Sequence, residues 1–332
     1  MDRIKSLDGL RGLAAYTVVL SHFSNQSGIL GGILGHGAGQ VGVMLFFAMS
    51  GYLMARLYIR QPFSQARIAG FFQRRVARVL PLYLLVVLTS YFWTRSTGFH
   101  WPFYSVTGEN LFAHLAMVRG DSVLWTIPVE VQFYLCVPLL WWAAERLGSS
   151  FVFLVLLLIG ITSLAGMPQE PVMLSRVSFF LIGVLIAMLP DRAGGKWANA
   201  AFVIAFFAYV ISFPQILGAL GIEVTRPVWN FPLYPLIIGS LLTASVYSPL
   251  ASTLFGTRLA RFAGEISYSV YLLHMVILQL IWNTPLREHL LSAMIAFFGL
   301  TTLAAFLSWR FFEYPARGLI NAIGGRQKDA IA

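Results

Sequence analysis

The sequence predicts an all-α membrane protein, a polytopic bundle of about ten transmembrane helices. Of its 332 residues, 58% are hydrophobic and only 11% are charged, which is far more apolar than a soluble domain. The apolar residues also form runs close to the length of roughly 20 residues that crosses the hydrocarbon layer. Residues 151–166, for example, lack the apolar and polar alternation of a β-barrel strand. We therefore expect helices to cross the bilayer.

Turn-forming stretches divide the apolar sequence, including residues 31–40, 167–171, 191–196 and 214–232. The predicted spans are residues 8–26, 38–58, 78–94, 124–143, 150–166, 172–190, 198–213, 231–248, 266–284 and 291–313. We predict no soluble domain. The transmembrane domain is expected to cover residues 1–318, followed by a short cytoplasmic tail over residues 319–332.

The basic residues indicate how these helices are oriented. With the N-terminus inside, 18 of the 23 lysines and arginines fall at cytoplasmic ends. They are Arg3, Lys5, Arg11, Arg56, Arg60, Arg67, Arg74, Arg75, Arg78, Arg146, Arg192, Lys196, Arg258, Arg261, Arg310, Arg317, Arg326 and Lys328. The outer ends hold Arg95, Arg119, Arg176, Arg226 and Arg287. The positive-inside rule then places both termini in the cytoplasm, and it explains the net charge of +10 better than a nucleic-acid partner does.

Residues 1–30 are basic and then apolar, as in a signal peptide. Arg11 interrupts the apolar part and no convincing small-residue cleavage site follows, so we predict an uncleaved first helix. Cys136 is the only cysteine, so an internal disulfide cannot form. We expect neither redox chemistry nor a metal site.

Arg11 and His22 lie eleven residues apart in the first predicted span. At about 100° per residue, this spacing brings them within about 20° of one helix face, with His22 about 16 Å further toward the outer surface. Asp8 precedes Arg11 by three residues, so a local ion pair is an alternative role for both. An ionisable residue inside a span usually faces a cavity or a partner, and we therefore assign His22 a functional role.

Glu130 places a carboxyl group inside the fourth predicted span, which begins LWTIPVEVQFYL at residue 124. A carboxylate in that position needs a partner. Tyr134 lies one turn further along the same face, and Pro128, which lacks an amide hydrogen, is expected to loosen the helix locally. A structural ion pair with an arginine or histidine is the alternative to a functional role.

The ninth predicted span carries a polar stripe, because Ser267, Tyr271 and His274 follow one another at steps of four and three residues. Such a stripe is typical of hydrogen bonding between membrane helices, and equally of a functional surface. The position of His274 near the middle of the membrane favours function slightly.

Residues 56–83 contribute six arginines, with Phe71 and Phe72 among them. We expect this segment on the cytoplasmic side, where topology and anionic lipid explain part of its charge. The planar guanidinium fork also fits phosphate oxygens, and coenzyme A carries three phosphate groups at its nucleotide end.

Together these motifs resemble the acyltransferase family 3 membrane proteins, from residue 3 to about residue 315. The similar segments are RIKSLDGLRGLAAYTVVLSHF, FFAMSGYLMARL, FFQRRVARVLPLYLL, LWTIPVEVQFYL and ISYSVYLLH. By this resemblance, Arg11 and His22 match the element in which ten residues separate an arginine from a histidine. Arg75 and Arg78 match the cytoplasmic Arg-x-x-Arg pair.

Three further elements of the family resemble this sequence, with one small departure at Met49, where a branched aliphatic residue is expected. They are the Trp-to-Glu motif at Trp125 and Glu130, the Ser-Gly pair at Ser50 and Gly51, and the Tyr-x-x-His element at Tyr271 and His274.

The resemblance implies an O-acyltransferase of the bacterial inner membrane. Proteins of this kind move acetyl or other short acyl groups from cytoplasmic acyl-CoA to hydroxyls of sugars, glycolipids, cell-wall glycans or macrolides. Acyl-CoA, with acetyl-CoA the first expectation, is then the co-substrate, and a carbohydrate or glycolipid is the acceptor. Some members carry a fused extracytoplasmic esterase-like domain, whereas we expect this chain to be the membrane module alone.

The resemblance also suggests roles for the conserved positions of the family. Arg75 and Arg78, with Arg11 nearby, would bind the phosphates of acyl-CoA. His22 would act as general base or carry the acyl group transiently, and Glu130 or Asp8 would orient its ring or accept a proton. The rival hypotheses are a transporter or flippase of acylated glycolipids and a scaffold for an envelope assembly.

Overall fold

The chain is helical in the computed structural model, and no strand occurs in the described residues. The described residues are 4–164, 172–191, 194–195, 197–222, 224 and 227–329. Four of the basic residues used to predict orientation, Arg3, Arg192, Lys196 and Arg226, lie outside these ranges. A helix occupies each of the ten predicted spans, which confirms the all-α prediction.

The helices group into two compact units, and each is described by itself. The first unit consists of Met1–Phe63 and Leu139–Ser267, and the second of Ser64–Pro138 and Tyr268–Ala332. Helix α5 (Thr126–Leu147) contributes to both units, because the division follows Pro138.

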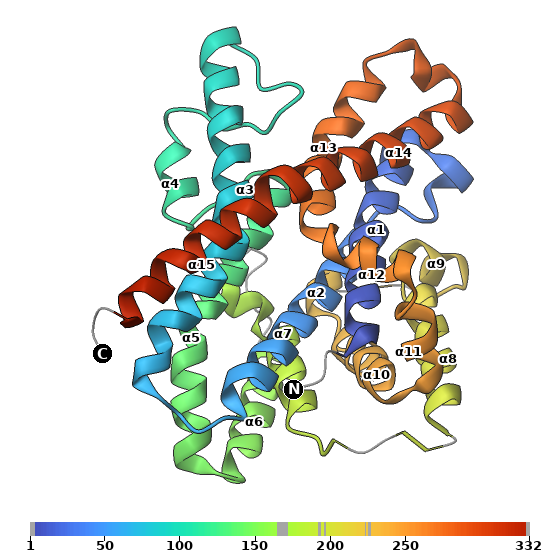
Figure 1. The fold of residues 1–332 in the computed structure, drawn as a ribbon. Coiled ribbons are helices and arrows are strands. Elements are labelled where there is room, and N and C mark those ends of the chain that lie inside the picture. The colour runs from blue at the N-terminus through green and yellow to red at the C-terminus, as the bar shows by residue number, and fades with distance from the viewer. Residues whose placement is uncertain are drawn as a thin grey trace. The chain divides into compact units, whose positions relative to one another are not determined.

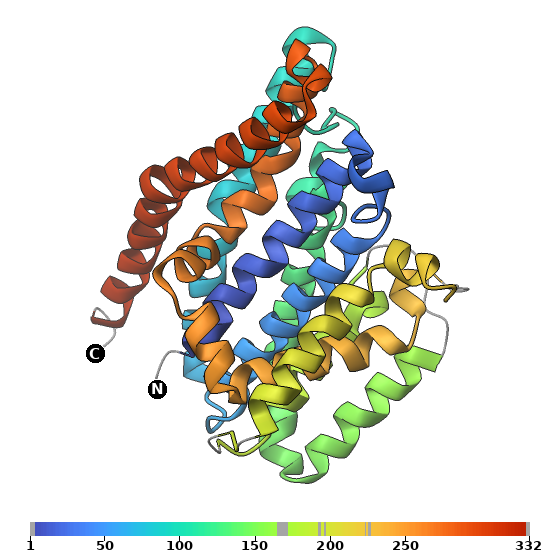
Figure 2. The ribbon, with the colours of Figure 1, turned by 90° about the vertical axis from the view of Figure 1, so that its right-hand side faces the viewer.

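The first unit is built around α1, which contacts α2, α11 and α12 (Figure 2). Further contacts join α2 to α7 and to α10, and α10 also contacts α8. The helices of this unit are α1 (Lys5–Ser27), η1 (Ile29–Gly32), α2 (Ala38–Met54), η2 (Ala55–Ile59), α6 (Ser150–Leu164), α7 (Met173–Ala187), α8 (Trp197–Ile211), α9 (Pro214–Ala219), η5 (Val228–Asn230), α10 (Leu233–Tyr247), α11 (Pro249–Phe255) and α12 (Arg258–Glu265).

Glycines let the start of α1 pack directly on α11 and α12. A Cβ atom at Gly9 would overlap the backbone of Phe255, and one at Gly264 would overlap the backbone of Asp8. Small residues at such positions allow membrane helices to approach closely and gain packing energy. These contacts hold in place the first turns of α1, which carry Arg11.

A reciprocal pair of glycines joins α2 to α7. A Cβ atom at Gly51 would overlap the carbonyl group of Phe180, and one at Gly183 would overlap the carbonyl oxygen of Ala48. Both backbones therefore approach within a distance that any side chain would prevent. Ser50, which precedes Gly51, is buried at this crossing with 8% of its surface exposed.

An ion-pair cluster connects the end of η2 to the chain just after α7. Arg60 donates a hydrogen bond of 3.0 Å to Oδ1 of Asp191, and Arg56 donates to the same oxygen. These hydrogen bonds from Arg60 and Arg56 lower the pKa of the Asp191 carboxyl, which favours its ionised form. Two of the arginines that the sequence assigns to the cytoplasmic side thus also join two helix ends.

The second unit pairs α3 with α15, which lie side by side in Figure 1. The side-chain amide of Gln73 on α3 donates to the carbonyl oxygens of Ile320 (2.6 Å) and Asn321 (3.3 Å) on α15. The helices of this unit, besides the first part of α5, are η3 (Gln65–Arg67), α3 (Ile68–Thr97), α4 (Leu111–Leu115), η4 (Ser122–Trp125), α13 (Ser267–Trp282), η6 (Pro285–Glu288), α14 (Leu290–Ser308), η7 (Trp309–Glu313) and α15 (Tyr314–Asp329).

Two helices extend further than their predicted spans. Helix α3 begins at Ile68, ten residues before the predicted start at residue 78, because arginine and glutamine are good helix formers outside the hydrocarbon as well. The π-helical turn η7 continues directly into α15, so most of the predicted tail over residues 319–332 is helical up to Asp329. Residues 330–332 lie outside the described part.

The expected effect of Pro128 on its helix is wrong. Helix α5 begins at Thr126, so Pro128 lies in the first turn, where backbone N–H groups have no partner within the helix. Proline is tolerated there without loosening the helix. The proline inside α5 is Pro138 instead.

Several helices of the described chain have the length and composition to cross a membrane. Four qualify individually, namely Ala38–Ile59, Gln65–Thr97, Ser122–Leu147 and Leu290–Ile323, and two bent pairs would raise the number to six. Helices α6, α7 and α8 are apolar but shorter. Large apolar side chains point outward, including Phe153 at 74% exposure and Ile204 at 69%, as expected for surfaces that face lipid. The chain is a multi-pass membrane protein, and the number of ten spans stays a prediction.

Replacing Gly183 with alanine tests the α2–α7 crossing. The added methyl group must displace the backbone of Ala48, and we expect a loss of about 1–3 kcal/mol in the free energy of unfolding. Gly160→Ala is the matched control, because a Cβ atom there has no neighbour within 4 Å. Thermal unfolding of both purified variants in detergent measures the difference. Equal melting temperatures for the two variants would contradict the close crossing.

Candidate functional site

The residues that the sequence singles out for function fall in both units. Asp8, Arg11, His22, Ser50 and Ser267 belong to the first unit. Arg75, Arg78, Trp125, Glu130, Tyr134, Tyr271 and His274 belong to the second unit.

Asp8 and Arg11 form an ion pair near the start of α1. Nη2 of Arg11 lies 3.2 Å from Oδ1 of Asp8, and only 17% and 9% of the two side chains are exposed. The local pair that their spacing predicts is therefore confirmed. Because Asp8 neutralises Arg11 within one helix, the free-energy cost of burying the Arg11 charge in the apolar bundle is reduced.

His22 lies on α1 about three turns beyond Arg11 and faces the start of α2. A Cβ atom at Gly39 of α2 would lie 3.7 Å from Cδ2 of the His22 ring and 3.3 Å from Ser21. The His22 side chain is half-buried. The His22 ring therefore lies at the contact between α1 and the start of α2, near Gly39.

In the second unit, Tyr134 connects Glu130 with Arg75. The Tyr134 hydroxyl donates a hydrogen bond of 2.5 Å to Oε1 of Glu130, one turn earlier on α5. The guanidinium carbon of Arg75 lies 5.8 Å from the centroid of the Tyr134 ring, a cation–π distance. The edge contact of Phe71 with the same ring, at 6.3 Å between centroids, completes the packing.

Two residues that the sequence analysis did not assign to the site join this group. The charges of Arg75 and Arg78 both act on Tyr134, and Arg78 also acts on Glu313 and Arg317. We call the five charged residues of this group the arginine cluster, which consists of Arg75, Arg78, Arg317, Glu130 and Glu313.

Glu313 is buried in the second unit, with 4% of its surface exposed, and it accepts a hydrogen bond from the Ser269 hydroxyl. It ends the π-helical turn η7, and Arg317 follows four residues later on α15. The i,i+4 spacing of a glutamate and an arginine was the available sequence signal. From the sequence, Arg317 is predicted only to be one of the cytoplasmic positive charges.

The polar stripe of the ninth predicted span forms hydrogen bonds with backbone carbonyl oxygens, both nearby in the sequence and on another helix. Ser267 donates to the carbonyl oxygen of Gly264 at 2.8 Å, and Tyr271 donates to that of Val123 at 3.0 Å. Nδ1 of the buried His274 lies 2.7 Å from the carbonyl oxygen of Tyr271, so this nitrogen carries the proton. These bonds support the structural alternative for the stripe.

A fully buried histidine that the sequence analysis did not single out, His114, has a structural role. Its Nδ1 donates to the carbonyl oxygen of Asn110 at 2.9 Å, and its Nε2 accepts from the amide of Asp121 at 3.1 Å. The Tyr83 hydroxyl donates to its carbonyl oxygen at 3.1 Å. With both ring nitrogens engaged, His114 joins the segment after α3 to the start of η4.

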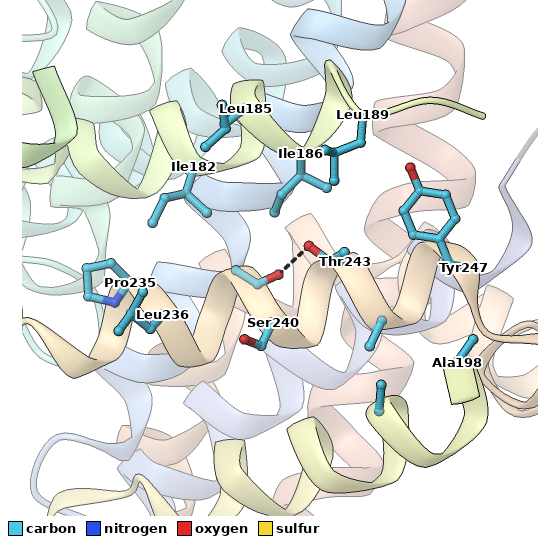
Figure 3. Close-up of a pocket in the computed structure, with 13 residues that line it drawn as sticks. Ile182, Leu185, Ile186, Leu189, Ala198, Pro235, Leu236, Ser240, Thr243 and Tyr247 are labelled. Atoms are coloured by element: carbon cyan, nitrogen blue, oxygen red, sulfur yellow. Dashed lines mark hydrogen bonds between the residues drawn. The ribbon is translucent and has the colours of Figure 1, made fainter. Parts of the chain in front are cut away.

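A groove of about 580 Å³ in the first unit lies between α7, α8 and α10 (Figure 3). Aliphatic side chains such as Ile182, Ile186 and Leu236 line it. Thr243 donates to the carbonyl oxygen of Gly239 in its own helix, at 2.7 Å. The lining offers no acid or base suited to group transfer.

The described residues contain no group of three or more His, Cys, Asp or Glu side chains placed to hold a metal ion. The chemistry of the arginine cluster suits an anion instead. Guanidinium groups bind phosphate and carboxylate oxygens through paired hydrogen bonds.

Comparison with known proteins assigns the chain to a family. Residues 4–310 match the family model described as an acyltransferase domain. The chain belongs to this acyltransferase family. The match includes most of both units and every residue that the sequence analysis singled out for function, and it ends before Glu313 and Arg317.

Curated relatives of this acyltransferase-family chain carry O-acetyltransferase names. The peptidoglycan O-acetyltransferase OatA of Listeria monocytogenes is 24% identical over 383 residues, which cover 97% of this chain and 57% of the relative. The O-acetyltransferase OatA of Staphylococcus aureus (strain NCTC 8325 / PS 47) is 24% identical over 357 residues, covering 95% and 57%. A Staphylococcus aureus (strain COL) protein with a provisional O-acetyltransferase name is 25% identical, covering 96% and 58%. The chain thus spans less than two thirds of these relatives, and no solved structure matches it.

Replacing Tyr134 with phenylalanine tests the contact at the centre of the second unit's site. The ring beneath Arg75 remains, whereas the hydrogen bond to Glu130 is lost, so we expect a loss of about 1–3 kcal/mol in the free energy of unfolding. Tyr91→Phe on α3 is the matched control, because the structure gives its hydroxyl no hydrogen bond among the described residues. Thermal unfolding in detergent compares the variants, and a Tyr134→Phe protein as stable as the control would argue against the contact.

Proposed function

We propose that the chain is a membrane O-acyltransferase that moves an acetyl or other short acyl group from cytoplasmic acyl-CoA to a hydroxyl of a carbohydrate, glycolipid or cell-envelope glycan. The observation that carries the proposal is the arginine cluster, in which Tyr134 contacts both Glu130 and Arg75, in a chain of the acyltransferase family. The cluster offers planar cations for phosphates, and the carboxyl group of Glu130 offers an acid or base nearby.

Arg75 and Arg78 are the proposed docking residues for the phosphates of acyl-CoA. Both are half-buried on one face of α3, and Nε of Arg75 is buried without a hydrogen-bond partner among the described residues. A buried guanidinium N–H group without a partner is costly, and a phosphate oxygen is a strong acceptor for it. Arg11 on α1 is a further proposed contributor to acyl-CoA binding.

In the proposed topology, the acyl-CoA binding residues face the cytoplasm, where acyl-CoA is made. Ten spans with both termini inside the cell would place the Arg-rich start of α3 in the cytoplasm of a bacterial inner membrane, where acyl-CoA is made. A phosphate group near that surface avoids the cost of entering hydrocarbon, and the thioester arm is thin enough to extend between helices.

A cell-wall glycan is the acceptor class that we favour. The printed name of the Listeria monocytogenes relative specifies peptidoglycan, and that relative matches nearly the whole of this chain. Sugar hydroxyls are weak nucleophiles, so transfer to them requires a general base.

His22 is the proposed general base, and Glu130 is the proposed second catalytic group, a carboxyl that accepts or returns a proton. The neutral imidazole takes the proton from the acceptor hydroxyl, whose oxygen attacks the thioester carbonyl carbon. The carbon–sulfur bond then breaks, the new ester remains on the acceptor, and the departing thiolate receives the proton from His22 and leaves as free CoA. Binding both substrates in one orientation contributes a large part of the rate.

Release of free thiol from acetyl-CoA tests the proposed enzyme. We expect purified wild-type protein with oligomers of N-acetylglucosamine to release CoA, and His22→Ala or Glu130→Gln to slow this release by about 100-fold or more, because a general base contributes about 10²–10⁴. His36→Ala is the matched control, since His36 is an exposed histidine of the same unit, and it should keep wild-type turnover.

Wild-type turnover in the His22→Ala variant would remove His22 from the mechanism. No thiol release by the wild-type protein, with any sugar acceptor, would favour the rival hypothesis of a transporter of already acylated glycolipids.

A further inference from the structure

Helix α15 brings a third arginine, Arg317, to the level of Arg75 and Arg78. The hydrogen bonds from Gln73 to Ile320 and Asn321 fix the register between the two helices. They run in opposite directions (Figure 1). Arg317 precedes Ile320 by about one turn, which corresponds to about residue 76 on α3.

Electrostatic interactions agree with this register. The guanidinium of Arg317 interacts with the charges of Arg78, Glu313 and Arg75. Nε of Arg317 is buried and has no hydrogen-bond partner in the part of the chain that the structure describes, as is also true of Nε of Arg75. Two arginines of the cluster, one on α3 and one on α15, therefore each have a buried N–H group that a ligand could use.

The negative charges of the cluster's two carboxyl groups do not neutralise the positive charges of its three arginines. Glu313 accepts from Ser269, and Glu130 accepts from the Tyr134 hydroxyl. With both carboxyl groups ionised, three guanidinium groups still leave one positive charge in excess. Like charges held close together in a partly buried site are unfavourable, and a bound anion relieves this repulsion.

We infer that Arg317 completes, with Arg75 and Arg78, a three-arginine site for the phosphate groups of coenzyme A. The inference rests on the proposed acyl-CoA donor. It names a binding residue on α15 that belongs neither to the arginine motif of α1 nor to that of α3. Coenzyme A carries a diphosphate and a separate ribose phosphate, so three guanidinium forks from two helices match its charge better than the pair on α3 alone.

The affinity for CoA of the full-length protein in detergent tests the role of Arg317. Isothermal titration should give a dissociation constant about 10- to 100-fold higher for Arg317→Gln than for wild type, because a charge-assisted contact to phosphate is lost. Arg310→Gln removes an exposed arginine three residues before Glu313, and this variant should bind CoA like wild type. The melting temperature without CoA should be equal in both variants, which separates binding from stability.

A second substitution keeps the test decisive if Arg317→Gln does not fold. Arg317→Lys keeps the charge and loses the planar fork, so its dissociation constant should lie between those of wild type and Arg317→Gln. Wild-type affinity in a folded Arg317→Gln or Arg317→Lys protein would overturn the inference. Absence of CoA binding by the wild-type protein would instead overturn the proposed donor.

Lipid headgroups also present phosphate, so the titration is repeated in nanodiscs of phosphatidylcholine and of phosphatidylglycerol. We expect the effect of Arg317→Gln on CoA affinity to persist in both. If phosphatidylglycerol abolished the difference between wild type and variant, the site would hold a lipid phosphate and the assignment to CoA would be wrong.

Discussion

The cost of burying charge in an apolar helical bundle shapes this protein more than any other constraint. Lipid offers no hydrogen bonds, so backbone groups are satisfied within helices and each charged side chain needs a partner. Asp8 forms an ion pair with Arg11 within one helix, and Asp191 forms ion pairs with Arg56 and Arg60 where two helices end. The arginine cluster differs, because its guanidinium groups outnumber its carboxyl groups and two of them hold buried donors without partners among the described residues.

Close packing between helices fixes the positions of these charged and polar side chains. The glycines of α1, α2, α7 and α12 let backbones touch, so Arg11 and Ser50 lie on helices whose positions within their unit are closely fixed. In the second unit the amide of Gln73 has the corresponding role, since it sets the register of α15 on α3. A site for a large, flexible donor benefits from such rigidity, because less ordering remains to be done on binding.

Sequence reasoning predicted the positions of the helices, the Asp8–Arg11 pair and the shared face of Glu130 and Tyr134, since these depend on local periodicity. It did not find Arg317 in the cluster, because a span predicted to end at residue 313 gave no reason to continue the helix through a π turn. The partners of Gly51 and Asp191 could not be predicted from the sequence either, because they depend on which helices pack together. Pro128 was misjudged because the exact start of α5 decides its effect.

We propose that the acyl group crosses the membrane, from a donor on the cytoplasmic side to an acceptor on the outer side. Sealed inside-out vesicles containing the protein, loaded with N-acetylglucosamine oligomers and given radiolabelled acetyl-CoA outside, test it most directly. We expect labelled oligomers inside the wild-type vesicles and about background label inside vesicles with the His22→Ala variant. Label that appears only when the oligomers and acetyl-CoA share the same side of the membrane would contradict it.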